Sequence, residues 1–204
     1  MQESSENPEA AMRRFLIYLL VSACAASASA QIPTPLTGGK LGRPHDELMA
    51  QQKLLVADYC RMDFMGGRLT PNGWQQMRQF TAMRDNPDFK TVFIISRYQV
   101  GESAASPTVR VNYVVIGRYE EGVGYTAMSG IKAVTFETRE IERELRIKAI
   151  DSSSPFVSRK AAIEWLQRKL PAASETLQKN IILAAIKALD TTPAAAPASA
   201  KPAQ

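Results

Sequence analysis

Apolar residues first recur at helical spacing between Asp46 and about Met65. They lie three or four residues apart, which places them on one face of a helix: Leu48, Leu55, Tyr59 and Met62. Asp46 is the expected N-cap, and Gly66-Gly67 supply a left-handed stop. A second, shorter helix is expected after Thr70 as N-cap and Pro71 as first helical residue. Its apolar edge is formed by Trp74, Met77, Phe80 and Met83.

The period changes after residues 86–88, where Asn, Pro and Asp break the second helix. Residues 92–100 and 108–116 alternate in the way that is typical of strands. Residues 131–138 and 144–150 are expected to pair as a hairpin, with Leu145, Ile147 and Ala149 facing inward. Turns are expected at residues 120–124 and at Ser129-Gly130. Both faces of 108–116 carry apolar residues, so helices should cover one face while the other lines an inner cavity.

Two more helices are expected at the C-terminal end. Ser158 caps the first, which Pro171 ends, and Ser174 caps the second. One face of the last helix carries Leu177, Ile181, Ala185 and Leu189. Helices at both ends of a run of strands indicate an α+β fold: two N-terminal helices, a curved antiparallel sheet of about four strands, and two C-terminal helices. Residues 44–190 are interpreted as this single domain. Residues 191–204 form an Ala/Pro-rich tail that we expect to be disordered.

The segment before the domain has the layout of a secretion signal, residues 1–30. Arg13 and Arg14 follow a plausible start at Met12, an apolar run follows, and residues 22–30 are mostly small. This order is that of a signal peptide, and the apolar run falls short of the ~20 residues that span a bilayer. Cleavage between Ala30 and Gln31 would release a soluble protein with a flexible leader at residues 31–43. Residues 21–24 also resemble a lipobox, in which Cys24 would carry a lipid. We favour the soluble product and expect a location in the periplasm or cell envelope, with secretion as a further destination.

Composition excludes several classes of function. The chain carries a formal net charge of +5, but its Lys and Arg residues are scattered and interleaved with Glu, as at residues 139–146. Nucleic-acid binders concentrate such charge on one face, so no nucleic-acid partner is expected. Membrane contact is expected only through the signal peptide or a lipid at Cys24. Cys60 is the one cysteine after the signal, and His45 is the single histidine. Neither supports a disulfide, a zinc site or a Ser-His-Asp triad, and no cofactor or metal is expected.

Several local features resemble the nuclear-transport-factor-2-like, or SnoaL-like, cone-fold superfamily, and in particular an uncharacterised exported bacterial branch of it. These features are residues 59–63, residues 67–70, Trp74, the break at 85–87 and the strand 109–117. The resemblance covers roughly residues 46–150. It implies a curved sheet around a pocket, in a superfamily that includes isomerases, dehydratases, cyclases and plain binding domains.

Enzymes of that superfamily use an Asp, His or Tyr inside the cone for proton transfer. The resemblance therefore makes Asp63 and Tyr59 the candidate catalytic pair, with Trp74, Tyr98, Tyr113 and Arg97 as candidates for lining a ligand pocket. Asp63 could equally bond a loop amide or pair with Arg61, Arg68 or Arg97. The histidine of the superfamily's enzymes has no counterpart, which favours a function other than catalysis.

Three hypotheses follow. The first is an exported binding or interaction module with a pocket for a small apolar ligand or a protein partner. The second is a cofactor-free isomerase- or dehydratase-like enzyme that uses Asp63 as general base. The third is a lipid-anchored envelope protein that assembles through the apolar face of its last helix.

Overall fold

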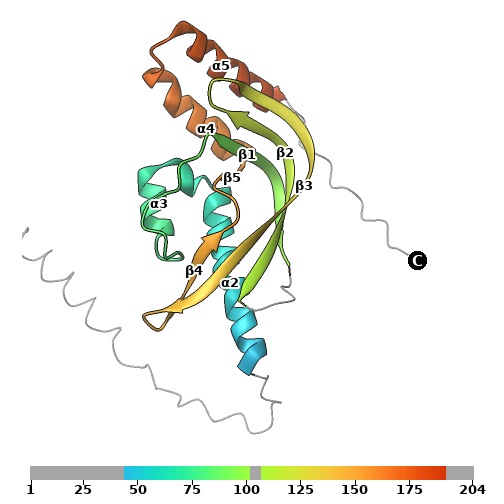
Figure 1. Ribbon diagram of the computed structural model, residues 1–204. Helices are drawn as coiled ribbons and strands as arrows, with labels where there is room; N and C mark the ends of the chain where they lie inside the picture. The colour runs from blue at the N-terminus through green and yellow to red at the C-terminus, as the bar shows by residue number, and fades with distance from the viewer. Residues whose placement is uncertain (1–43, 102–106, 192–204) are drawn as a thin grey trace, which may run out of the picture. The chain divides into compact units, whose positions relative to one another are not determined.

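The computed structural model describes residues 44–101 and 107–191. This part of the chain has an α+β fold with four α-helices and one curled five-stranded sheet (Figure 1). The expected signal peptide, with Cys24 and the Ala30–Gln31 junction, lies outside the described residues. The leader at 31–43 and all of the tail except Thr191, which ends the last helix, also lie outside them.

The sheet has the strand order β4-β3-β2-β1-β5. Its strands are β1 (Thr91–Val100), β2 (Thr108–Glu120), β3 (Gly124–Ile141), β4 (Glu144–Ile150) and β5 (Phe156–Ser158). Strands β1 to β4 pair antiparallel, and β5 runs parallel to β1. The register shifts where β1 meets β2, around Ile95, and again where β2 meets β3. Such bulges bend strands and increase their twist, which fits the curl of this sheet.

The expectation of an antiparallel sheet of about four strands is therefore wrong in one respect. Residues 156–158 form a fifth strand, and its parallel pairing makes the sheet mixed. The turn expected at Ser129-Gly130 is also wrong, because β3 runs through both residues. The hairpin of β3 and β4 forms, but Ala149 is exposed rather than inward. The register shift next to Thr138 explains this, since it changes which β4 residues face the core.

The N-terminal helices are α2 (Pro44–Phe64) and α3 (Pro71–Met77), joined by the 3-10 turn η1 (Gly67–Leu69). Gly66 has φ +88°, which confirms the left-handed stop. The Thr70 hydroxyl accepts the Gly73 N–H at 3.1 Å, which confirms this cap. Two expected boundaries are wrong: α2 begins at Pro44, before Asp46, and α3 ends at Met77, so that Phe80 and Met83 follow it in a loop.

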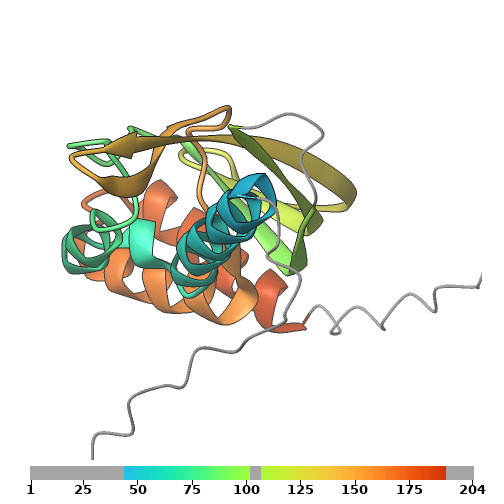
Figure 2. The ribbon, with the colours of Figure 1, turned by 90° about the horizontal axis from the view of Figure 1, so that it is seen from below.

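Buried side chains form two clusters on the sheet. The odd-numbered residues of β2 are buried from Val109 to Tyr119, as alternation requires. One cluster lies beneath α2 and includes Tyr113 and Phe136. The other lies against the C-terminal helices and includes Tyr119, whose ring meets Trp165 edge to face. Figure 2 shows the helices gathered on one side of the sheet. The helices and their core thus cover the odd-numbered face of β2, as expected. The even-numbered face is half-buried or exposed and lines no inner cavity in the described structure, so that part of the expectation is wrong.

The C-terminal helices are α4 (Arg159–Lys169) and α5 (Thr176–Thr191), with the 3-10 turn η2 (Leu170–Ala172) between them. The Ser158 hydroxyl accepts the Ala161 N–H, which confirms the cap. The face expected on α5 is only partly right. Ala185 and Leu189 are buried, but Ile182 is the third buried residue, and Leu177 is 69% exposed. Because Ala185 and Leu189 pack inside the protein, they offer no surface for assembly through that stripe.

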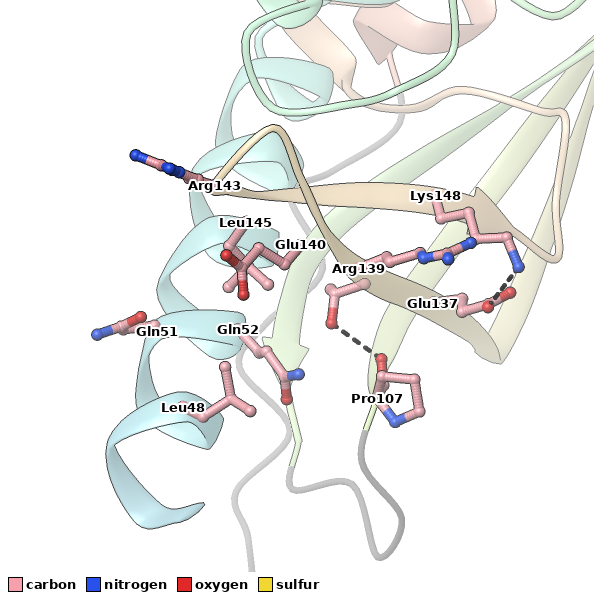
Figure 3. A pocket seen from close by; sticks show the side chains of 11 residues that line it. Leu48, Gln51, Gln52, Pro107, Glu137, Arg139, Glu140, Arg143, Leu145 and Lys148 are labelled. Atoms are coloured by element: carbon pink, nitrogen blue, oxygen red, sulfur yellow. Dashed lines mark hydrogen bonds and ion pairs between the residues drawn. The ribbon is translucent and has the colours of Figure 1, made fainter. Parts of the chain in front are cut away.

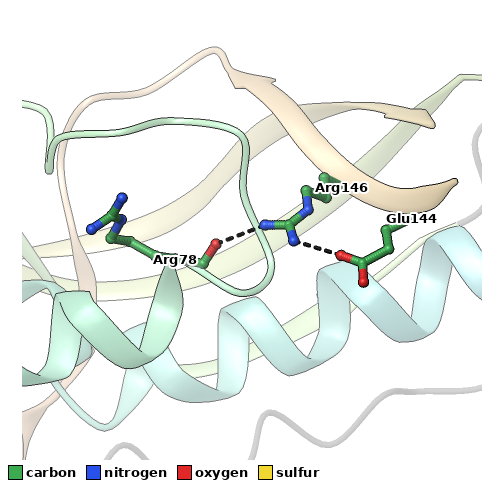
Figure 4. Close-up of polar contacts among 3 residues, drawn as sticks. All are labelled: Arg78, Glu144 and Arg146. Carbon is green, nitrogen blue, oxygen red and sulfur yellow. Dashed lines mark hydrogen bonds and ion pairs between the residues drawn. The ribbon is translucent and has the colours of Figure 1, made fainter. Parts of the chain in front are cut away.

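The outer edge of β4 is covered by the loop that follows α3. Ile147 exchanges main-chain hydrogen bonds with this loop, donating to Phe80 O and accepting from Ala82 N. Beside it, Arg146 donates to the Arg78 carbonyl oxygen and pairs with Glu144 (Figure 4). An uncovered edge strand invites pairing with another chain, and these contacts protect the middle of β4.

Candidate functional site

The inward face of α2 carries a stripe of buried polar side chains. Gln52, Tyr59 and Asp63 lie on this face together with Val56, and all four are at most 2% exposed. Their spacing of four, three and four residues keeps them on one side of the helix. One polar atom in each of the three polar residues, Gln52 Oε1, the Tyr59 hydroxyl and Asp63 Oδ1, has no hydrogen-bond partner in the described structure. Such buried atoms are uncommon in folded proteins and need a physical or functional reason.

Asp63 contacts the main chain of β5. Its Oδ2 accepts the Phe156 N–H at 2.9 Å. Burial raises the pKa of the Asp63 carboxyl from 3.8 to about 6, while the Arg68 guanidinium and the Phe156 N–H act in the opposite direction. A carboxyl with this pKa could exchange a proton near neutral pH.

Arg68 lies near this carboxyl and is only 2% exposed. Its guanidinium donates to Asn86 Oδ1 at 3.2 Å and to the carbonyl oxygens of Ser154 (3.3 Å) and Ser153. Asn86 in turn donates to the Arg68 carbonyl oxygen at 2.7 Å. The buried charge is thus well solvated by protein oxygens. The arginine joins η1 to the loops that lead into β1 and β5.

Tyr59 and Cys60 complete this interior group. Burial raises the pKa of the Tyr59 hydroxyl above its ordinary range and that of the Cys60 thiol to about 12. The Cys60 sulfur lies 3.1 Å from the Tyr113 hydroxyl. The thiol therefore stays protonated at neutral pH and is a poor nucleophile.

The predicted catalytic pair thus lies together, but inside packed protein. Three hollows are formed by described residues, and neither Tyr59 nor Asp63 lines any of them. A general base must come within hydrogen-bond reach of its substrate. The described structure offers Asp63 no such approach. The carboxylate does bind a main-chain amide, but that amide belongs to strand β5 and not to a loop as expected.

Two of the four predicted pocket residues, Tyr98 and Tyr113, are cross-strand partners with ring centroids 6.2 Å apart, but none of the four lines any of those hollows. Trp74 is 7% exposed and belongs to the core beneath α2. Tyr113 is stacked on Phe156 with ring centroids 4.0 Å apart. Tyr98 is half-buried, and Arg97 is exposed. Trp74 and Tyr113 therefore act as core aromatics here, which corrects the expectation of a pocket lined by these four residues.

A different hollow lies between the first half of α2 and the β3–β4 hairpin (Figure 3). Its volume is about 590 Å³, within the roughly 300–1,000 Å³ that is usual for ligand pockets. The helix contributes Leu48, Gln51 and Gln52 to its wall. The strands and the start of β2 contribute Pro107, residues 137–140, Arg143, Leu145 and Lys148.

Gln52 is the buried polar group of this hollow. The side chain projects from α2 toward Pro107 (Figure 3), and its unpartnered oxygen is an acceptor for an N–H or O–H. Charged residues surround the hollow with both signs. Lys148 and Glu137 form an ion pair at 2.8 Å, whereas Arg139, Glu140 and Arg143 form no ion pair with any described residue.

The tip of the hairpin beside the hollow is strained. Glu142 and Arg143 form a two-residue turn with φ 55° and 68°. Such turns favour Asn-Gly, because other residues lose energy in the left-handed region. Strained non-glycine residues cluster at functional sites, so this tip adds to the case for the hollow.

Sequence reasoning missed this hollow. Gln52 stands four residues before Val56 on the apolar face of α2, and a polar residue at a core-facing position was the available signal. The predicted inner cavity drew attention to aromatic residues instead. Which strand residues would face Gln52 depends on the register of β3 and β4, which the apolar pattern alone does not determine.

Comparison with protein-family models, curated proteins and solved structures finds no match. Among residues 44–101 and 107–191, no three His, Cys, Asp or Glu side chains are placed to hold a metal ion. None of the helices in these ranges is long and apolar enough to cross a membrane.

Proposed function

We propose that this protein is an exported binding module of the cell envelope that holds a small ligand in the hollow between α2 and the β3–β4 hairpin. The observation that carries the proposal is the buried, unpartnered amide oxygen of Gln52. Leaving such an atom unpaired costs about 1–3 kcal/mol. This oxygen is covered in the described structure, so a ligand that donates a hydrogen bond there would recover the cost once the wall of the hollow opens around Gln52.

The lining favours a ligand that has polar groups as well as the apolar surface expected from the sequence. The walls carry charges of both signs beside the apolar side chains of Leu48 and Leu145. A membership in the cone-fold superfamily is part of the same proposal, and the order of helices and curled sheet supports it.

Binding is favoured over catalysis because of where Asp63 lies. Its carboxylate is 2% exposed, hydrogen-bonded to the β5 main chain and close to Arg68. For an isomerase-like function, the packed core would have to open next to Asp63 so that a substrate could reach its carboxylate.

The proposal is tested with N-methylacetamide, a small amide that supplies one N–H donor. We expect it to shift the NMR signals of the Gln52 side chain and its neighbours in a saturable way. Gln52→Leu should weaken binding about tenfold, the usual effect of one lost hydrogen bond. The same substitution should leave the thermal midpoint unchanged or higher, because it removes an unsatisfied buried group. Gln167→Leu, at an exposed position of α4, is the matched control and should change neither property.

The combination of weaker binding and undiminished stability separates a ligand site from a structural one. If Gln52→Leu lowers stability and N-methylacetamide shifts no signal near residue 52, the proposed site is wrong.

A further inference from the structure

The hollow contains a stretch of strand edge that has no partner among the described residues. Strand β2 begins at Thr108, which pairs with Glu137 of β3. The last contact between β3 and the chain that leads into β2 comes from Thr138. Its N–H and hydroxyl both donate to the Pro107 carbonyl oxygen, at 2.8 and 2.9 Å. Strand β3 continues to Ile141 with β4 on its other side. Among the residues that the structure describes, the end of β3 therefore has a neighbouring strand on one side only.

Alternation shows which main-chain groups face the open side. In an antiparallel ladder, alternate residues exchange hydrogen bonds with the same neighbour. Ile141 and Glu144 flank the two-residue turn and form its closing pair, so Arg139 also bonds toward β4. Thr138 and Glu140 then point the other way, as the Thr138 bond to Pro107 shows. The N–H and C=O of Glu140 therefore face the hollow. No described residue outside the β3–β4 pairing forms a hydrogen bond with them.

The opposite wall supplies a third main-chain-like group. The Gln52 amide oxygen is buried and lacks a donor, and both Gln52 and Glu140 line the same hollow. One side of the hollow thus offers an N–H and a C=O in strand geometry, and the other offers an acceptor.

We infer that this hollow binds a short peptide in extended conformation, an inference that rests on the proposed function of the site. One peptide residue exchanges two main-chain hydrogen bonds with Glu140, as an added strand does. Another peptide N–H donates to Gln52 Oε1. A volume of about 590 Å³ suits a few residues rather than a folded partner.

The charged residues of the hollow fit the C-terminal end of such a peptide. Arg139 forms no ion pair with a described residue and lies on the strand next to Glu140, so it can bind a C-terminal carboxylate. The Lys148–Glu137 pair stands on the same side of the hollow. A free carboxylate should therefore bind better than the corresponding amide.

The test uses the full mature chain from Gln31 and acetyl-trialanine with a free carboxylate. We expect this peptide to bind at least about tenfold more tightly than N-methylacetamide, because it forms more than one hydrogen bond. It should also slow hydrogen exchange at the Glu140 N–H. The same peptide with N-methyl groups on its alanine nitrogens has the same side chains and carboxylate but no N–H to donate. It should bind no more tightly than N-methylacetamide.

A pair of variants tests the strand edge itself. Glu140→Pro removes the main-chain N–H that faces the hollow, at an edge position where proline is tolerated. It should abolish the advantage of the tripeptide and leave N-methylacetamide binding at Gln52 intact. Glu140→Ala keeps the N–H and should bind the tripeptide like the wild-type protein.

The outcomes separate the two proposals. Binding of N-methylacetamide at Gln52 without tighter binding of the tripeptide would overturn the peptide inference and leave the binding site standing. Equal binding of the N-methylated peptide would also overturn it. Failure of both probes to reach Gln52 would overturn the proposed function as well.

Discussion

At the scale of single residues, Asp63 links two segments that are far apart in the chain. It lies near the end of α2, and its carboxylate accepts the Phe156 N–H of β5. The neighbouring Arg68 binds the Ser153 and Ser154 carbonyl oxygens just before that strand. Together the two residues hold the start of β5 against the N-terminal helices. This arrangement explains buried charges without requiring a reaction.

The Asp63 carboxyl should make stability depend on pH in an unusual direction. Its pKa rises from 3.8 to about 6 because it is buried, so the folded state holds the proton more tightly than the unfolded state. Ionisation therefore destabilises the fold, and this contribution is lost as pH rises from about 4 to 6. Relative to Asp63→Asn, which keeps an oxygen for Phe156, the wild-type protein should lose about 2–3 kcal/mol of unfolding free energy over that range.

Urea unfolding of both proteins at about pH 4 and pH 7 measures this difference. Asp58→Asn is the matched control, since the Asp58 side chain is half exposed on the same helix and pairs with Arg61 at the surface. It should show no such trend. A wild-type protein that gains stability relative to Asp63→Asn as pH rises would show that Arg68 outweighs burial.

Sequence reasoning reached part of this residue-level picture. The superfamily resemblance selected Asp63, and its alternative partners were a loop amide or one of three arginines, at positions 61, 68 and 97. Of these arginines, Arg68 is the one that acts on the Asp63 carboxyl. Sequence reasoning did not select Gln52, although this polar residue stands four residues before Val56 on the apolar face of α2. A glutamine is common on helix surfaces, and its burial depends on the sheet that lies opposite.

At the scale of elements, close backbone contact fixes η1 against α3. A Cβ on Gly73 would lie 2.8 Å from the Gly67 Cα and would overlap the Gly67 carbonyl oxygen. Neither atom can move without shifting the main chain. Alanine normally stabilises a helix by ~1 kcal/mol relative to glycine. Here Gly73→Ala should instead destabilise by about 1–3 kcal/mol, as overpacking does.

Chemical denaturation checks this reversal of sign. Gly130→Ala in β3 is the control, because nothing lies within 4 Å of the added Cβ. It should be neutral or stabilise by up to about 1 kcal/mol. A stable Gly73→Ala protein would mean that η1 and α3 pack less closely than described.

Substitutions in the β3–β4 turn should increase the stability of the protein. Glu142 and Arg143 both have positive φ, which costs about 1–2 kcal/mol per non-glycine residue. Glu142→Asn combined with Arg143→Gly should raise the unfolding free energy by about 1–2 kcal/mol. Glu142→Ala with Arg143→Ala removes the same charges but keeps both Cβ atoms. If that pair stabilises equally, the gain comes from charge and not from backbone strain.

Elements whose boundaries depend on neighbouring residues in the sequence could be predicted. Elements that depend on pairing with distant residues could not. The caps at Thr70 and Ser158 and the stop at Gly66 depend on neighbouring residues, and all three are present. Strand β5 has three residues and exists only through its pairing with β1. The length of β3 was also hidden, because Ser129 and Gly130 suggest a turn locally while pairing with β2 keeps that stretch extended.

At the scale of the whole molecule, the α+β class could be predicted from the order in which helical and strand-like spacings of apolar residues follow one another along the chain. The mixed sheet and the position of the hollow could not. The mixed sheet depends on the parallel pairing of the short strand β5 with β1. The position of the hollow depends on the register of β3 and β4, which shifts beside Thr138 without changing the apolar pattern much. The predicted ligand site was therefore placed in the interior, whereas the described hollow lies at the open end beside the hairpin.

Export is the remaining whole-molecule prediction, and it bears on what the hollow could meet. Expressed from Met12 in a Gram-negative host, the protein should appear in the periplasm with Gln31 as its first residue, as mass spectrometry can establish. Changing Arg13 and Arg14 to Glu should retain it in the cytoplasm, because the charged start of a signal is required. Palmitate labelling that disappears in Cys24→Ala would instead establish the lipid-anchored product. Residues 31–43 would then connect the hollow to a membrane surface, where its ligands would be envelope peptides rather than freely diffusing ones.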